Sequence, residues 1–385
     1  MSATRTRGRF FGELESTRGI AALLVAGFHC AQATVLSATS VRHNLWDITE
    51  PGPVWQALHE VYRVFVYQRG DQLHNGVLFF FVLSGFVLTD SLEHGPSPVG
   101  RAAGRFAIAR LFRIYPAIIA TVLFFALFYA LTGIALSPNA YSIRSLLRNM
   151  LLLQVDIDAI MWTIQVELAA IPLIFVAFLL KRRWGFPVLV PLTVGLAITT
   201  FSGWWWQLLR PYPPFRPAWL YVFLVGMIAY YLGRELVPTL KKSTATIILI
   251  SSLLVFFFVE TVIHKQWGVL FRTLSGAAIV AILAFRPAVP GTAILRTSPL
   301  RFLGRVSYSF YLLHYLTVPV MLRGAEWFSA WVKSGVPIVL LAIFLWITTT
   351  AAVLPFAWLM HRTVEMPSIR FGKWLWKIAA GKTTA

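Results

Sequence analysis

The chain has 385 residues, of which 58% are hydrophobic, 15% aromatic and 13% charged. Soluble globular domains carry about 25% charged residues, so this composition excludes a water-soluble enzyme. The 34 Lys and Arg residues outnumber the 15 Asp and Glu residues and leave a net charge of +19. Because the cytoplasmic loops of membrane proteins collect Lys and Arg, this charge indicates membrane topology, and we expect no nucleic-acid partner. Cys30 is the single cysteine, so no intramolecular disulfide can form.

Long apolar runs bounded by charge, proline or glycine predict an all-α polytopic membrane bundle, because a helix needs about 20 apolar residues to cross a bilayer. We expect a single membrane domain over residues 1–385, whose last part, 360–385, is a basic cytoplasmic tail. About ten crossings use half the chain or more, which leaves no room for a separate soluble domain. The ten predicted spans lie near residues 17–38, 75–92, 114–133, 162–180, 186–201, 217–232, 244–263, 268–285, 304–322 and 335–359.

The loops between these spans alternate in charge. With Arg5, Arg7 and Arg9 in the cytoplasm, every second loop is basic, and both termini are predicted to be cytoplasmic. These arginines also resemble the start of a signal peptide, but cleavage after the first span would remove the strongest chemical motif of the chain. We therefore interpret the first apolar run as a membrane span. The segment 141–154 is apolar but short, and it predicts a helix on the outer face.

Ionisable side chains inside membrane spans are costly and usually functional. Arg18 and His29 are eleven residues apart. Eleven residues make about three helical turns, so both side chains leave the first span on one face, with a rise of about 16 Å between them. A desolvated imidazole is neutral and can accept a proton from a hydroxyl group. We predict that His29 is a general base; the alternative is a structural histidine that bonds a neighbouring helix.

Arg110 and Arg113 occupy positions i and i+3 at the inner end of the third span. Two guanidinium groups on one helix face suit the recognition of phosphate. Together with Arg18, Arg101 and Arg105 they predict a cytoplasmic cluster for a polyphosphate or phosphonucleotide ligand. The alternative is ordinary anchoring of the span to lipid headgroups.

Three further polar positions are candidates for substrate contact, and one is a candidate for catalysis. Glu167, near the outer start of the fourth span, is predicted either to orient His29 or to pair with an arginine for packing. Ser307, Tyr311 and His314 share one face of the ninth span, so they point inward. We expect them to contact substrate or a neighbouring helix.

Other chemistries find little support. Cys30 follows His29, but adjacent residues of a helix point about 100° apart, which disfavours an acyl-thioester on Cys30. The sequence has no Gly-x-Ser-x-Gly elbow, no Walker loop and no paired-histidine signature, so we expect no metal. Glu260, near the outer end of the seventh span, is assigned no role.

An ordered set of motifs resembles membrane-bound acyltransferase family 3, the multi-span O-acyltransferases of bacterial exopolysaccharide, O-antigen and related glycans. The matching stretches are Glu15-Ser16-Thr17-Arg18-Gly19 running to Phe28-His29, Gly76 to Phe86, Arg110 to Pro116, Trp162 to Glu167, Leu303 to His314 and Val364-Glu365-Met366-Pro367. They span nearly the whole chain in order.

The resemblance implies roles for these residues. Arg18 and His29 correspond to the family's Arg-x10-His motif, with His29 essential to transfer, and Arg110 and Arg113 to its Arg-x-x-Arg motif, associated with the acyl-CoA donor. The implied protein is a bacterial inner-membrane O-acyltransferase. It transfers an acyl group, by family default acetyl, from cytoplasmic acyl-CoA to a hydroxyl of a cell-surface or lipid-linked glycan. One departure is that Leu168-Ala169-Ala170 replaces the aromatic residue that commonly follows the Glu at position 167.

A transporter or flippase for a glycan or lipid intermediate is the alternative function. Ten spans with buried His and Glu also describe proton-coupled carriers. Such carriers usually show two related halves, and no internal repeat is evident in this sequence. Neither reading identifies the oligomeric state.

Overall fold

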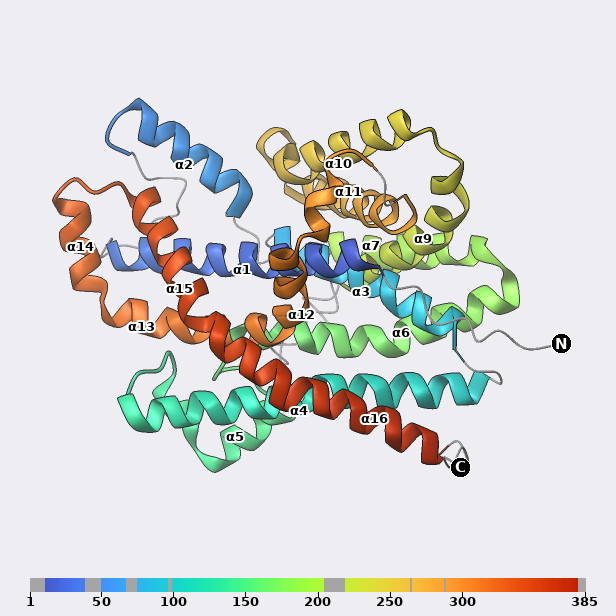
Figure 1. The fold of residues 1–385 in the computed structure, drawn as a ribbon, viewed down its shortest axis with the longest axis horizontal. Helices are drawn as coiled ribbons and strands as arrows, with labels where there is room; N and C mark the ends of the chain where they lie inside the picture. The colour runs from blue at the N-terminus through green and yellow to red at the C-terminus, as the bar shows by residue number, and fades with distance from the viewer. Residues whose placement is uncertain are drawn as a thin grey trace.

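The computed structural model describes residues 11–38, 50–66, 75–95, 99–203, 219–263, 265–286 and 289–379. Within these ranges all regular secondary structure is helical. In this part of the chain eight helices are long and apolar enough to cross a membrane. The predicted all-α polytopic membrane bundle is therefore confirmed (Figure 1).

The longer helices have the following bounds. They are α1 Gly12–Ala38, α2 Pro53–Val66, α3 Asn75–Glu93, α4 Val99–Thr132, α5 Ile143–Met150, α6 Trp162–Trp184, α7 Leu189–Phe201, α9 Leu220–Leu236, α10 Lys242–Val262, α11 Lys265–Phe285, α12 Ser298–Leu313, α13 Thr317–Arg323, α14 Ala325–Lys333, α15 Ile338–Met360 and α16 Met366–Ala379. A 3-10 turn, His314–Leu316, joins α12 to α13, and a π-helical turn, His361–Glu365, joins α15 to α16.

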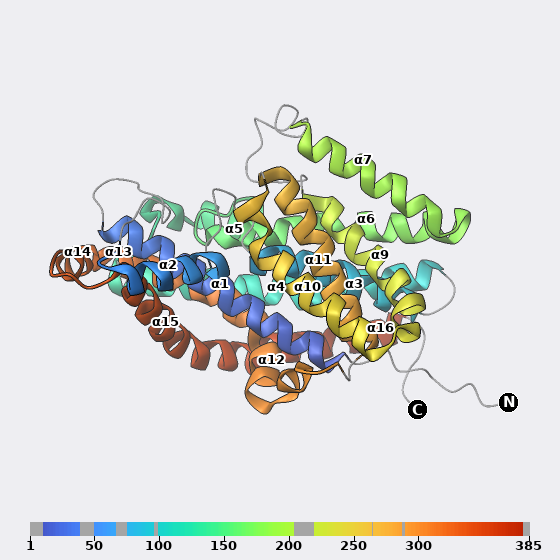
Figure 2. The ribbon, with the colours of Figure 1, turned by 90° about the horizontal axis from the view of Figure 1, so that it is seen from above.

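Each of the ten predicted spans overlaps a helix, although residues 217 and 218 of the sixth span lie outside the described residues. Two spans differ from the prediction. The span 186–201 coincides with α7, which is shorter than a membrane crossing, and Figure 2 shows α7 standing at the edge of the bundle. The span 304–322 is divided into α12 and α13 by the 3-10 turn. The count of ten spans therefore stays a prediction.

Two predicted boundaries differ because helices continue past the apolar runs. The span 114–133 is only the second half of α4, a helix of 34 residues that begins at Val99. The segment 360–385, predicted as a basic tail, is helical as far as Ala379 and packs on α4, where Gly372 lies against Phe112. The apolar side of this amphipathic helix explains the packing, since it covers part of α4. Residues 380–385 lie outside the described residues.

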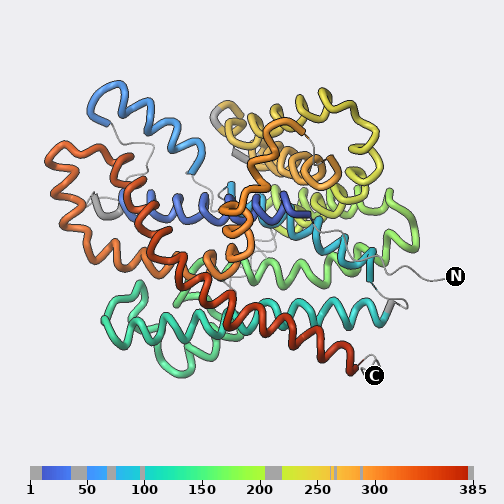
Figure 3. The backbone as a smooth tube through the Cα atoms, in the orientation of Figure 1, coloured from blue at the N-terminus to red at the C-terminus, as the bar shows by residue number. Residues whose placement is uncertain are grey.

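Short helices lie at one end of the bundle, opposite to the end where α1 starts and α16 stops. The predicted surface helix within 141–154 is α5, whose exposed side includes Ile143 and Leu147. α2, which the sequence analysis did not predict, is amphipathic as well. Figure 3 shows the chain path, with the start of α1 and the end of α16 at one end of the bundle. This arrangement agrees with both termini on one side of the membrane, and the cytoplasmic side stays a prediction.

The central helix is α1, which packs closely on α12 and α3. Gly19 of α1 faces Gly304 of α12, and a Cβ at Gly19 would lie 2.7 Å from the Gly304 nitrogen. On α3, Gly76 lies directly against the Ala21 carbonyl of α1. Small residues let membrane helices approach until their backbones touch. The two contacts along α1 therefore fix which residues of α3 and α12 face its polar positions.

Candidate functional site

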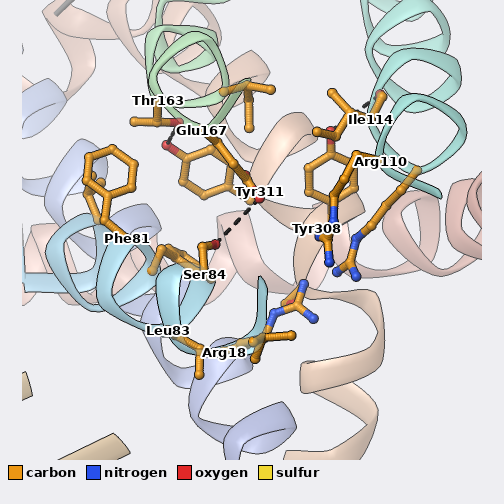
Figure 4. Close-up of a pocket in the computed structure, with 16 residues that line it drawn as sticks. Arg18, Phe81, Leu83, Ser84, Arg110, Ile114, Thr163, Glu167, Tyr308 and Tyr311 are labelled. Carbon is orange, nitrogen blue, oxygen red and sulfur yellow. Dashed lines mark hydrogen bonds between the residues drawn. The ribbon is translucent and has the colours of Figure 1, made fainter. Parts of the chain in front are cut away.

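Three arginines line one cavity between α1, α3, α4, α6 and α12 (Figure 4). Arg18 comes from α1, and Arg110 and Arg113 come from α4. The cavity has a volume of about 80 Å³. The structure thus brings together the three residues that the sequence predicted as a phosphate cluster. Arg101 and Arg105 lie in the first turns of α4, before Arg110; they are exposed and do not line this cavity.

The helical spacing on α4 explains how two of these side chains reach the cavity. Positions i and i+3 of a helix lie on the same face. Arg110 and Arg113 are such a pair, and Arg18 enters from the neighbouring α1; Figure 4 shows Arg18 and Arg110 directed into the same space. The Arg110 guanidinium is repelled by those of Arg113 and Arg18. Three like charges in one partly buried site need anions to compensate them.

Glu167 supplies one compensating charge. It lines the cavity from α6, and its Oε1 accepts a hydrogen bond from the Ser84 hydroxyl at 3.5 Å. Its carboxylate attracts Arg18 and Arg110. Of the two roles expected for Glu167, pairing with an arginine matches this placement.

Glu365 supplies the second charge, and the sequence analysis assigned it no role. Its side chain is buried in the π-helical turn, where Oε2 accepts from the Ser309 hydroxyl at 3.1 Å and lies 2.8 Å from Nδ1 of His361. The carboxylate attracts Arg113 and Arg18. The available signal was the Val364-Glu365-Met366-Pro367 stretch, which contributed only to the family resemblance. The cavity wall itself holds three arginines and one glutamate, so it keeps a surplus of positive charge for a ligand.

Hydroxyl groups complete the cavity wall. Ser307 and Tyr311 line it, as predicted for residues on one inward face of α12. The Tyr311 hydroxyl lies 2.9 Å from the Thr163 hydroxyl, and the Tyr308 hydroxyl donates to the Ile114 carbonyl at 3.4 Å. Ser84, Thr163 and Tyr308 were not predicted, although Thr163 lies four residues before Glu167 on the same face of α6, and this spacing was the available signal.

His29 lies outside this cavity, further along α1. Its side chain is buried, with the His314 ring at a centroid distance of 5.4 Å and the Tyr315 ring at 4.9 Å. His314, the third residue of the predicted polar face of α12, also lies outside the cavity. The structure therefore separates the predicted site into an arginine cavity and a pair of imidazoles beyond it.

Cys30 packs away from both parts. Its thiol donates to the Thr349 hydroxyl at 3.6 Å in a buried cluster with Leu341 and Leu345. A covalent acyl-thioester would need this thiol to leave its packed surroundings. We expect Cys30→Ser to retain transfer activity within about twofold of wild type, because a serine hydroxyl can also bond Thr349. The measurement is the transfer activity of the purified variant beside wild type; a loss of about 100-fold or more would contradict this expectation.

Glu260, to which no role was assigned, forms an ion pair with Arg272 between α10 and α11. Arg272 is 1% exposed, and Gly268 leaves room for the Glu260 side chain. Charged groups inside a membrane are usually paired in this way. No group of three or more His, Cys, Asp or Glu residues suited to a metal ion occurs among the described residues.

The helical bundle, its buried cationic cavity and the two adjacent imidazoles define a polytopic membrane protein with a polar site inside the bundle. The family model described as an acyltransferase domain matches residues 11–362. Because the match covers nearly the whole chain, the protein belongs to acyltransferase family 3, as the motifs predicted. No curated protein and no solved structure matches the chain.

Proposed function

We propose that the protein transfers an acyl group, acetyl by family default, from cytoplasmic acyl-CoA to a hydroxyl of a cell-surface or lipid-linked glycan at the outer side of the bacterial inner membrane. Family membership supports acyl transfer. The observation that supports acyl-CoA as the donor is the cavity that Arg18, Arg110 and Arg113 line together. Arginine is the side chain best suited to phosphate, and acyl-CoA is a phosphate-bearing acyl donor.

The charges and size of the cavity support this donor. Since three arginines and one glutamate line the cavity, the site favours an anionic group. The cavity leaves room beside the arginines for a phosphate group of the donor. Anchoring to lipid headgroups is the weaker interpretation, because Arg110 and Arg113 line a cavity between five helices.

The chemistry follows from the position of His29. The α1 helix places His29 about 16 Å along its axis from Arg18, so a donor held at the arginines extends its thioester along α1. His29 accepts the proton of the glycan hydroxyl while the hydroxyl oxygen attacks the thioester carbonyl carbon. The new C–O bond forms, the C–S bond breaks, and the proton passes from His29 to the thiolate of CoA. Holding both substrates in one site replaces an encounter in solution.

Acyl-CoA turnover by the purified protein tests this function. With acetyl-CoA and a glycan fraction from the source cells, we expect CoA release that depends on the glycan. Comparative glycan mass spectrometry of wild-type and deletion strains then identifies the acyl group from the mass difference. A carrier would instead move glycan across vesicle membranes without CoA release, and unchanged glycan masses in the deletion strain would overturn the proposal.

Arg113→Ala is expected to weaken donor binding. A charge-assisted bond to phosphate contributes about 1.5–3 kcal/mol, so KM for acyl-CoA should rise about 10- to 100-fold. Arg105→Ala is the matched control, because Arg105 is an exposed arginine of the same helix outside the cavity. Both variants should be compared in thermal melting, since removing Arg113 leaves Glu365 with one cation fewer. An unchanged KM and CoA affinity in folded Arg113→Ala would remove the arginine cavity from donor binding.

A further inference from the structure

His314 lies at the break between α12 and α13. α12 ends at Leu313, the 3-10 turn begins at His314, and α13 begins at Thr317. Pro319 in the first turn of α13 lacks an N–H group, which favours a break just before it. Non-helical backbone at membrane depth is tolerated only where protein surrounds it or water fills a cavity. His314 meets this condition, since its side chain is 1% exposed.

The hydrogen bond of His314 fixes its tautomer. Nδ1 lies 2.6 Å from the Tyr311 carbonyl oxygen, one of the carbonyls at the end of α12 that need a partner. A carbonyl oxygen can only accept, so Nδ1 carries the hydrogen. The lone pair of neutral His314 is then on Nε2. Nε2 is buried and has no hydrogen-bond partner among the residues that the structure describes.

This acceptor lies beside the proposed base. The rings of His314 and His29 are 5.4 Å apart between centroids and are inclined by 35°. Tyr315 also packs edge-on against His29, with an interplanar angle of 81°. A centroid distance of 5.4 Å is short enough that rotation of the His29 ring, or one bridging water, can bring an N–H of His29 to Nε2 of His314. The pairing depends on α1 and α12 running in parallel, with Gly19 against Gly304.

We propose that His314 is the positioning residue for His29. Nε2 of His314 accepts an N–H of His29, which fixes the lone pair of His29 on its other nitrogen, toward the glycan hydroxyl. When His29 takes up the hydroxyl proton, the imidazolium keeps this acceptor and is stabilised. A carboxylate has the same task in a serine-protease triad, whereas here a neutral imidazole performs it. Nδ1 of His314 keeps its proton and its hydrogen bond to the Tyr311 carbonyl throughout. Glu167 is not part of this pair, since it stays with the arginines.

This inference rests on the proposed function, and two substitutions separate it from a structural role. His314→Asn keeps an amide N–H near the Nδ1 position, so it can still bond Tyr311, but it has no acceptor at Nε2. His314→Gln offers an amide oxygen near the Nε2 position and loses the bond to Tyr311. We expect kcat to fall at least about tenfold in His314→Asn, with KM for acyl-CoA unchanged, and to fall less in His314→Gln. A structural anchor would produce the opposite order, with His314→Asn closest to wild type.

The experiment measures kcat and KM for acetyl-CoA turnover by wild type and both variants, together with their melting temperatures. His94→Gln is the matched control, because His94 lies at the far end of α3 beside Asp90 and is exposed. Higher kcat in His314→Gln than in His314→Asn supports the inference, and any other order overturns it. Absence of turnover in wild type would instead overturn the proposed function, and with it the base that His314 is proposed to position.

Discussion

His29→Ala is expected to abolish acyl transfer while leaving the protein folded and able to bind CoA. A positioned general base contributes about 10²- to 10⁴-fold to a rate, so kcat should fall by that factor. Donor binding should persist, because the arginine cavity that includes Arg18 does not include His29. Turnover of acetyl-CoA and binding of CoA are measured on the same preparation. Chemistry and donor binding should be separable because His29 and the arginine cavity are distinct parts of the site.

The control for His29→Ala is Gln32→Ala, an exposed position on the same helix. It should match wild type in turnover, in CoA binding and in melting temperature. Near wild-type transfer by His29→Ala, with the protein in the membrane, would exclude His29 as the base. Loss of both transfer and CoA binding would show a wider structural effect and would contradict the separation of the two parts.

Gly304→Ala is expected to cause a large loss of stability, because its Cα lies directly against the backbone of α1 at the centre of the bundle. A Cβ at Gly304 would overlap the carbonyl oxygen of Glu15 and would lie 2.8 Å from the Glu15 Cγ. The obstacle is backbone, which cannot rotate away, so α1 and α12 must separate. Overpacking of this kind costs about 1–3 kcal/mol or more. Because α1 carries Arg18 and His29, activity should fall as well.

Thermal melting in detergent measures this effect, with Gly195→Ala as the control. Gly195 lies within α7, where an added Cβ meets nothing within 4 Å. The control should be neutral or slightly stabilising, since alanine has the higher helix propensity. Equal melting temperatures for Gly304→Ala and Gly195→Ala would show that α1 and α12 are not packed backbone to backbone.

The helices were largely predictable because a bilayer sets the length of an apolar run. α2 and α16 were missed as elements, since an amphipathic helix at a surface needs no such run. The break between α12 and α13 was also missed, because hydropathy averages over it. Pro319 was its local signal, and only the packing of His314 shows that the break is part of the site.

The residues of the site also divide into those that one helix alone predicts and those whose partners lie on other helices. Arg110 and Arg113 line one cavity, as two residues on one face of a helix with a period of 3.6 residues can, whereas Arg18 lines that cavity and His29 lies outside it. Glu365 was not assigned, since its partners other than His361 come from helices far away in sequence. The sequence left two roles open for Glu167, orienting His29 or pairing with an arginine, because both depend on which neighbouring helix its carboxylate meets.

The sequence by itself determined the membrane-bundle class, the acyltransferase family and the polar faces of single helices, because these depend on composition and on local periodicity. Only the tertiary structure decided which faces meet. The backbone contacts of Gly19 with Gly304 and of Gly76 with Ala21 set the positions of neighbouring helices along α1. Those positions place Glu167 with the arginines and His314 beside His29. Contacts between helices depend on side-chain shapes summed over the whole interface, which no single stretch of sequence contains.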